Sequence, residues 1–453
     1  MINIMESLKN IAAIEWLEAV LFERFGLPLV IENSSGALSL RLSSNAEVIE
    51  FATDGSEFSD NQFNIPISLV DVDNEGVTSF IPGPLPAPGL ESCTQLLRKV
   101  ERGYIVSFNI LAFTYWMLNR VEEVGRADLD RHGRFPATAS HAFKNNYLSR
   151  PIVDEWLYVL GQVIVLLWPQ VALKINEFRM AVSHDVDIPG RYSFASPYKL
   201  LRRMAGDFLR SDIRGVMVAP LSRLGSRQRI SKLDPANTFD WIMDVSEANN
   251  VESAFYFICG RTESSLDGDY EIEHPAMRTL LRNIHARGHE IGVHPSYNSY
   301  QSPTLIQAEF ERLKSVCAEE GIHQDIWGGR MHYLRWEHPT TLLAWNAAKL
   351  NYDSTLGYAD IPGFRCGTCF EYQGFDPVNH RIQNLRIRPL IVMDVSILDK
   401  PYLGLGPTEE AYNKFKELKD HCRAAGGIFS ILWHNSNFSK KAEFELYARV
   451  IAC

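Results

Sequence analysis

Cysteine is scarce in this sequence, and long hydrophobic runs are absent. Only 7 of the 453 residues are cysteines, and a small odd number is typical of proteins kept in a reducing compartment. The longest apolar stretch, Trp156–Trp168, is interrupted by Gly161 and Gln162 and is too short to cross a bilayer. Residues 1–16 lack the apolar core of a signal peptide. We therefore expect a cytoplasmic protein without a transmembrane segment.

Internal repeats and low-complexity tracts are also missing, and the composition is that of a folded globular chain. Hydrophobic residues make up 46% and charged residues 22%, which at this length suggests two or three domains. The net charge of -10 disfavours a nucleic-acid partner. The charge is uneven, however: residues 1–100 hold 14 acidic and 5 basic residues, whereas residues 190–235 hold 10 basic and 3 acidic ones.

The N-terminal third shows elements of mixed type. Residues 1–150 are predicted to form an α+β domain of unknown role, and residues 151–175 a connecting helix. Four prolines within residues 81–89 predict a segment without regular structure. A helix is expected at 5–25, and strands at 29–31, 38–42 and 47–51.

Strands and helices alternate beyond residue 176, which predicts an α/β catalytic domain over 176–453 with a parallel sheet or barrel. In such folds the catalytic groups lie at the carboxyl ends of the strands. Strands are expected at 178–183, 254–258, 290–293, 390–394 and 428–433, and helices at 239–249, 275–287, 303–320, 340–350 and 409–425.

Polar side chains follow several of these strands. Asp185 and Asp187 are two residues apart on an extended segment, so their carboxylates point to the same side. Such a pair can divide the work, one holding a metal and the other acting as a base, although a lone pair of this kind is more often a solvated turn. His294 ends another strand, where an imidazole is well placed to bind a metal.

Three further motifs complete the set. They are Gly329–Arg335, Tyr352–Gly357 with Gly363–Gly367 after it, and Ile431–Asn435, which ends in a histidine and an asparagine. Each is weak alone, but all the motifs occur in order, most of them just beyond a strand.

The order and content of these motifs resemble the polysaccharide deacetylase family (NodB homology, carbohydrate esterase family 4), in the branch that carries an extra N-terminal domain. The resemblance covers about residues 176–440. It implies a distorted (β/α) barrel of the NodB-homology type, preceded by a smaller α+β domain. It also implies a divalent metal, with zinc as the expected ion.

The resemblance implies a role for each matching residue. Asp185 resembles the base and Asp187 the metal ligand, and the inserted Val186 leaves these two roles exchangeable. His294 matches the first metal-binding histidine, but the position of the second is occupied by Asn298. An amide oxygen binds such ions more weakly than imidazole does. Whether Asn298 or His332 supplies the missing ligand stays open.

The resemblance assigns the remaining catalytic and substrate-binding roles to residues of the later motifs. Arg330 is expected to brace the base, the backbone N–H of Tyr333 to bind an oxyanion, and His434 to act as a general acid beside the carboxylate of Asp394. The residues expected to contact substrate are His332, Arg365 and Trp433.

The implied function is metal-dependent removal of an N-acyl group, acetyl or formyl, from an amino sugar of a surface polysaccharide or its precursor. A second hypothesis, favoured by Asn298, is a catalytically altered barrel that binds glycan. A third is a hydrolase of a small non-sugar amide or imide. Asp185, Arg330 and His434 disfavour the glycan-binding hypothesis, because a protein that only binds glycan does not need an acid and a base together.

The basic insertion at 195–235 follows the first motif and is expected to lie over the mouth of the active site. Its arginines suit a phosphate-bearing substrate or an anionic membrane surface, contacted through 198–234. The alternative is a solvated helical surface that pairs with the acidic N-terminal region. The oligomeric state is left open.

Overall fold

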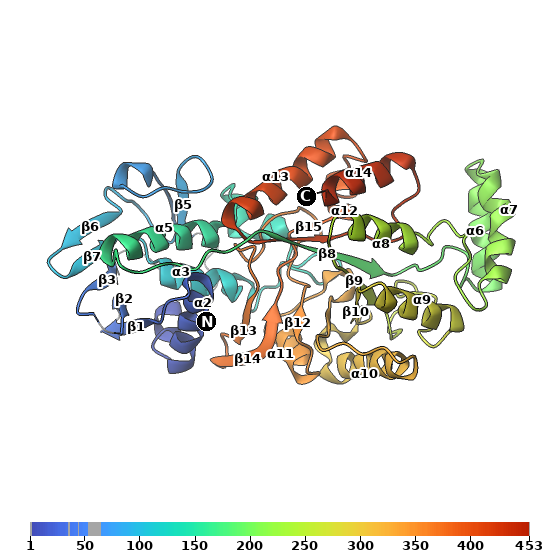
Figure 1. Ribbon diagram of the computed structural model, residues 1–453, viewed down its shortest axis with the longest axis horizontal. Coiled ribbons are helices and arrows are strands. Elements are labelled where there is room, and N and C mark those ends of the chain that lie inside the picture. Colours follow the sequence, from blue (N-terminus) through green and yellow to red (C-terminus); the bar gives the residue numbers. More distant parts are fainter. Residues whose placement is uncertain (1, 35–36, 44, 53–64, 453) are drawn as a thin grey trace.

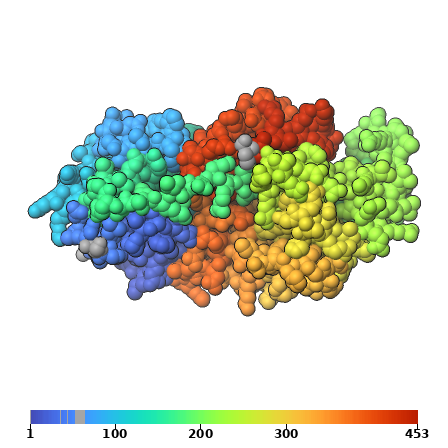
Figure 2. All heavy atoms as spheres, in the orientation of Figure 1, coloured from blue at the N-terminus to red at the C-terminus, as the bar shows by residue number. Residues whose placement is uncertain are grey.

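The computed structural model describes residues 2–34, 37–43, 45–52 and 65–452. The molecule is elongated (Figure 1). Its N-terminal residues form one end, and a pair of helices within residues 197–225 forms the other, as the space-filling view also shows (Figure 2). The C-terminal elements lie between these two ends.

A mixed five-stranded sheet dominates the N-terminal part. Its order is β1-β2-β3-β7-β6, in which β3 and β7 are parallel and the other neighbours antiparallel. The strands are β1 (Leu29–Ser34), β2 (Ala37–Leu42), β3 (Val48–Phe51), β6 (Leu97–Val100) and β7 (Gly103–Val106). The helices here are α1 (Ile4–Ser7), α2 (Ile11–Phe25), α3 (Ile110–Leu118), α4 (His141–Lys144) and α5 (Ile152–Leu167).

Helix α2 shows why these elements form and where they pack. The side chain of Asn10 accepts a hydrogen bond from the N–H of Ala12 at its start, and Gly26 ends it in the left-handed conformation. Its buried Trp16 packs against Phe375, and the Trp16 indole N–H donates to the carbonyl of Gln373 at 2.7 Å. The N-terminal part therefore shares one hydrophobic core with the C-terminal part.

The proline-rich stretch is more regular than expected. Residues Leu85–Pro88 form β5, which pairs antiparallel with β4 (Ile67–Val70) in a two-stranded sheet. Proline is tolerated in a strand whose N–H groups are not needed by a second neighbour, which is the situation of an edge strand. The expectation of no regular structure at 81–89 was wrong for these four residues.

The C-terminal part is built on a nine-stranded sheet. Its order is β13-β14-β12-β11-β10-β9-β8-β16-β15, and only β13 runs antiparallel to its neighbour. The strands are β8 (Arg179–Val186), β9 (Ser253–Phe257), β10 (Glu290–Val293), β11 (Gly328–Gly329), β12 (Tyr352–Asp353), β13 (Tyr372–Asp376), β14 (Arg381–Ile387), β15 (Val392–Met393) and β16 (Ile428–Leu432).

The expected α/β architecture is present, but the described strands do not show a closed barrel. Strand β14 pairs with β12 and β15 pairs with β16, at opposite sides of the sheet order. The segment between them crosses over: Leu390 N–H donates to Leu356 and Ile391 N–H to Ser430. The parallel strands are thus curved toward one another and joined by this irregular segment, which brings their carboxyl ends together.

Helices connect the strands and cover the sheet. Helix α13 shows the signals that the sequence carries, because Thr408 caps its start and Gly426 ends it in the left-handed conformation. None of the described helices is both long and apolar enough to span a membrane. The helices are α6 (Pro197–Leu209), α7 (Ile213–Gly225), α8 (Phe239–Ala248), α9 (Pro275–Ala286), α10 (Pro303–Glu319), α11 (Thr340–Ala347), α12 (Asp394–Leu398), α13 (Glu409–Ala425) and α14 (Lys441–Ile451).

Candidate active site

The two carboxylates of the first motif lie at the carboxyl end of β8. The strand runs to Val186, three residues further than expected, so that Asp185 is its penultimate residue and Asp187 follows it directly. Because side chains alternate along a strand, Asp185 and Asp187 point into the space enclosed by the curved sheet. His184 points the other way and packs on Phe255 in the core.

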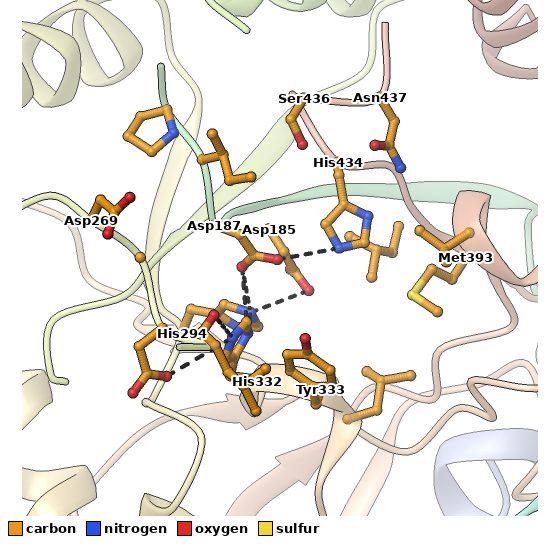
Figure 3. A pocket seen from close by; sticks show the side chains of 18 of the residues that line it. Asp185, Asp187, Asp269, His294, His332, Tyr333, Met393, His434, Ser436 and Asn437 are labelled. Atoms are coloured by element: carbon orange, nitrogen blue, oxygen red, sulfur yellow. Dashed lines mark hydrogen bonds and ion pairs between the residues drawn. The ribbon is translucent and has the colours of Figure 1, made fainter. Parts of the chain in front are cut away.

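Three side chains converge beside Asp185. The Nε2 atom of His294, the Nδ1 atom of His332 and the Oδ1 atom of Asp187 lie within 4.8 Å of one another. The two histidine nitrogens are 3.0 Å apart, and Asp187 Oδ1 is 3.2 Å from His294 and 3.4 Å from His332. Figure 3 shows the two imidazoles on one side of Asp187 and His434 on the other. We call Asp187, His294 and His332 the three-donor cluster.

The tautomers of both histidines are set by backbone carbonyls. His294 Nδ1 lies 2.6 Å from the carbonyl oxygen of Arg330, and His332 Nε2 lies 3.2 Å from that of Leu266. A carbonyl only accepts, so each of these nitrogens carries the hydrogen. The facing nitrogens are then left with lone pairs. Asp187 Oδ1 is buried and receives no well-directed hydrogen bond from any described residue.

Three lone pairs that face one another require a cation between them. Ligands about 2.0 Å from a tetrahedral zinc ion lie about 3.3 Å from each other, which matches the separations in the three-donor cluster. The pKa values indicate the same preference for positive charge. Burial lowers the pKa of His294, but the carboxylates of Asp185 and Asp187 outweigh it and leave that pKa raised. The donor set therefore fits a divalent metal that accepts imidazole and carboxylate ligands.

The same surroundings shift the pKa values of the other two members of the cluster, His332 and Asp187. Burial lowers the pKa of His332. Burial acts to raise the pKa of Asp187, but the neighbouring His332 and His294 outweigh it, and the pKa lies well below the ordinary value. Asp187 therefore stays ionised at neutral pH, as a metal ligand must.

Of the two alternatives for the missing ligand, Asn298 does not reach the cluster. Its side chain is turned away from the cluster: Nδ2 donates to the carbonyl of Thr262 at 3.3 Å, and Oδ1 accepts from Arg335 at 3.0 Å. Asn298 is also exposed at the start of a short turn, whereas the two histidines of the cluster are buried. His332, the other alternative and also an expected substrate contact, lies in the third place.

Arg330 fixes the second carboxylate. It is fully buried, and its Nη1 atom donates to Asp185 Oδ1 at 2.7 Å. The rest of the guanidinium donates to the hydroxyl of Ser183 and to the carbonyl and hydroxyl of Ser354. Asp185 Oδ2 remains 3.7 Å from His294 Nε2. One oxygen of Asp185 is thus held by the protein while the other faces the three-donor cluster.

His434 and Asp394 lie together beside Asp187 of the cluster. Asp394 is fully buried and accepts from the Nδ1 atom and the backbone N–H of His434, at 2.9 and 3.0 Å. Asn437 donates to the same carboxylate at 2.8 Å. Burial lowers the pKa of His434, but the charge and hydrogen bond of Asp394 outweigh it and raise the pKa to about 10. His434 Nε2 faces Asp187 Oδ2 at 3.7 Å and carries a proton at neutral pH.

The backbone at Tyr333 is left-handed, with φ 61° at Tyr333 and 54° at Leu334. Non-glycine residues seldom adopt this conformation, and strained backbone of this kind gathers at functional sites. Arg134 donates to the carbonyl of Tyr333 at 2.9 Å, while no described residue accepts from its N–H. The N–H group is thus available to a ligand in the pocket.

Asp185, the three-donor cluster, Tyr333 and His434 line one cavity of about 500 Å³. Part of its wall comes from basic residues of two segments. The histidine- and arginine-rich segment 127–150 was not predicted to reach the site, whereas the basic insertion was expected over its mouth. The basic residues are Arg131, His132, Arg134, Lys199 and Arg203.

Two expected substrate contacts lie outside the cavity. Arg365 is buried and pairs with Glu123, at 2.6 and 2.9 Å, so it is a structural cation. Trp433 is fully buried and stacks on Phe415 and Phe438 in the core. Its ring lies on the opposite face of β16 from the cavity because consecutive residues at a strand end point to opposite sides.

Comparisons with known proteins were made for the whole chain. Residues 14–169 match a family described as of unknown function, DUF7033. No curated protein matches. Among solved structures, the chain is similar to a protein from Mycobacterium smegmatis named as a polysaccharide deacetylase, with 17% identity and a TM-score of 0.38 over 61% of this chain and 85% of that one.

Two other solved structures are similar over the same share of this chain. One is the allantoinase Puue, with 13% identity and a TM-score of 0.36, of which 83% is covered. The other is named as a polysaccharide deacetylase from Pseudomonas aeruginosa PAO1, with 14% identity and a TM-score of 0.37, of which 84% is covered.

Proposed function

We propose that the protein is a metal-dependent hydrolase that removes an N-acyl group from an amino sugar of a surface glycan or its precursor. The observation that carries this proposal is the placement of a base and an acid beside one cation site. Asp185 lies 3.7 Å from His294 of the three-donor cluster, and His434, whose pKa is raised to about 10, lies 3.7 Å from Asp187 of the same cluster. Amide hydrolysis needs both groups, one to take a proton from water and one to give a proton to the amine.

Asp187, His294 and His332 would hold a divalent ion, and we expect zinc because the donors are two imidazoles and one carboxylate. The ion when bound supplies a Lewis acid that polarises the acyl carbonyl and lowers the pKa of water. Asp185, which Arg330 holds in position, takes up the proton of the attacking water. The N–H of Tyr333 stabilises the oxyanion. His434 donates its proton to the departing amine, and Asp394 keeps its ring in place.

The glycan-binding alternative was favoured by the absence of a second histidine at residue 298. His332, from a different loop, would supply that ligand, which supports the hydrolase instead. A sugar suits the cavity because its wall combines aromatic rings with many hydrogen-bonding groups. The aromatic residues are Phe194, Tyr270, Tyr333 and Tyr402.

The first test is the metal content of the purified protein after incubation with zinc, measured by elemental analysis. We expect about one ion per chain in the wild type, and a loss of at least about tenfold in affinity for His294→Ala and His332→Ala. Asn298→Ala is the matched control and should keep the ion. Absence of metal from the wild type, or its loss from Asn298→Ala instead of His332→Ala, would contradict the proposed site.

The second test measures acetate release from N-acetylated amino-sugar oligomers. Asp394→Asn keeps the shape of the site but no longer orients His434 as a cation. We expect kcat to fall by about 10² or more, with the zinc content unchanged. A wild-type protein that holds zinc but binds these oligomers without cleaving them would favour the glycan-binding hypothesis. Unchanged kcat in Asp394→Asn would remove His434 from the mechanism.

A further inference from the structure

The basic insertion is folded as a helical hairpin with most of its large apolar side chains outside. Helices α6 and α7 pack on each other and project from the end of the molecule (Figure 1). The residues they bury are small or charged: Asp207 in α6, and Gly215, Ala219 and Ser222 in α7. A surface helix ordinarily buries its apolar stripe, so this packing is inverted.

The exposed apolar residues follow helical spacing. In α6 they recur at 198, 201 and 208, with Leu209 beside them, and in α7 at 213, 217, 221 and 224, three or four residues apart. Nine of the 24 exposed large hydrophobic residues among the described ones lie within residues 198–233, and each is at least half exposed. They are Tyr198, Leu201, Phe208, Leu209, Ile213, Met217, Leu221, Leu224 and Leu233. A patch of this size on an otherwise ordinary surface marks a contact with a partner.

The hairpin is held in this arrangement by polar contacts at its base. Asp207 accepts from the Tyr192 hydroxyl at 2.8 Å and pairs with Arg191 and Arg210. Asp234 accepts hydrogen bonds from the N–H groups of the loop that begins at Arg191. These contacts hold the hairpin in place, so the exposure of its apolar residues is a property of the folded structure and not a result of poor packing.

Cations surround the apolar residues, and several have no anionic partner. The three carboxylates of residues 190–235 already have partners. Asp212 caps α7, while Asp207 and Asp234 make the polar contacts at the base of the hairpin. Lys199 and Arg203 pair with Asp269. Within the described chain, no ion pair involves the following exposed cations: Arg202, Arg214, Arg227, Arg229 and Lys232.

The hairpin adjoins the active-site cavity. Lys199 and Arg203, on α6, line the cavity together with Phe194, which precedes the helix. A surface that engaged the apolar face of the hairpin would thus lie next to the entrance of the site.

We propose that the α6–α7 hairpin docks the protein on the surface of an anionic lipid bilayer. Exposed aliphatic and aromatic side chains flanked by unpaired arginines suit the boundary between acyl chains and anionic headgroups. A second copy of the chain is disfavoured, because a two-fold contact through this face would bring the same uncompensated cations together. The docking does not depend on the proposed hydrolase activity, but together they point to a substrate carried on lipid.

Co-sedimentation of the full-length protein with vesicles tests this proposal. We expect binding to vesicles of phosphatidylcholine mixed with phosphatidylglycerol, weaker binding to phosphatidylcholine alone, and a decrease as salt is raised. The apolar variant combines Leu201→Ser, Phe208→Ser, Met217→Ser and Leu221→Ser. The charge variant combines Arg202→Gln, Arg214→Gln, Arg227→Gln and Arg229→Gln. The matched control changes four exposed apolar residues elsewhere: Leu305→Ser, Ile326→Ser, Val378→Ser and Ile382→Ser.

The apolar and charge variants should each bind anionic vesicles at least about tenfold more weakly, and the control should bind as the wild type does. Thermal unfolding and sedimentation velocity accompany each measurement. No wild-type binding to anionic vesicles, or equal loss in the control, would overturn the proposal. The proposal would also be overturned if the wild type formed a dimer without lipid and the apolar variant did not. The apolar face would then be an interface between two copies of the chain.

Discussion

At the scale of the residue, the direction of a lone pair decides which side chain can be a ligand. Asn298 lies four residues after His294 and has a suitable oxygen, yet its amide is taken by Thr262 and Arg335. His332 is 38 residues away, and its free nitrogen faces His294 because its other nitrogen is bound to a carbonyl. Spacing along the chain therefore predicted the wrong partner for His294.

A half-buried acid at the other end of the strands gives a prediction on pH. Glu290 accepts a hydrogen bond from the Tyr352 hydroxyl, and burial raises its pKa to about 7. Since this pKa lies above the unfolded value, the protonated acid stabilises the fold below about pH 4.5, and that contribution is lost as pH rises through 7. Glu290→Gln keeps a polar group without the charge.

We expect the stability of Glu290→Gln relative to wild type to rise by about 2 kcal/mol between pH 5 and pH 8.5, because only wild type must deprotonate. Denaturant unfolding at the two pH values measures the difference. An equal difference at both values would show that Glu290 is not protonated preferentially in the fold.

At the scale of the element, strand ends place the chemistry. The two-residue strand β11 is formed only by Gly328 and Gly329, and it holds Arg330 and His332 next to β10. A Cβ atom on Gly329 would lie 1.8 Å from the carbonyl oxygen of Val293, which is far inside contact distance. Glycine at this position is required by the close approach of two backbones.

Gly329→Ala is therefore expected to destabilise the protein by about 3 kcal/mol and to weaken zinc binding, because β11 must move away from β10. Gly206→Ala in α6 is the matched control. Its Cβ atom would meet only the flexible end of Arg210, at 3.4 Å, and alanine favours a helix. Thermal unfolding and elemental analysis test both variants. Similar stability in the two would contradict the packing of β10 against β11.

At the scale of the whole molecule, the N-terminal part is joined to the site by buried ions. Glu123 lies between Arg120 and Arg365, at 2.8 and 2.6 Å, and its pKa is about 2. Burial acts to raise this pKa, but the two arginines outweigh it. Arg134 reaches the carbonyl of Tyr333 in the cavity. The predicted boundary near residue 150 therefore separates segments of sequence that share one buried network.

Glu123→Gln should destabilise the whole protein by about 3 kcal/mol, since it leaves two buried arginines without a carboxylate. Glu409→Gln, which breaks the exposed pair with Arg449, is the control and should have a much smaller effect. Denaturant unfolding followed by fluorescence measures both. A loss of stability in Glu123→Gln no larger than in Glu409→Gln would contradict a shared network.

Local patterns determined which elements form and which chemical groups end them. The helix at 409–425 and the strand at 290–293 have the predicted bounds, because capping residues and alternating side chains are short-range signals. Asp185 pairs with Arg330 and His434 with Asp394, and the catalytic roles that the resemblance implied for them stay predictions. These residues follow strands, and parallel strands bring their carboxyl ends to one place.

Only the tertiary structure decided which residues complete the site. Arg365 and Trp433 belong to the core, and His332 replaces Asn298 beside His294. The sequence also did not show the order of the strands in the sheet, or that α6 and α7 pack through small and charged residues. Composition and spacing along the chain record which groups are present, whereas side-chain direction, burial and the partner of each lone pair are set by contacts between residues far apart in sequence.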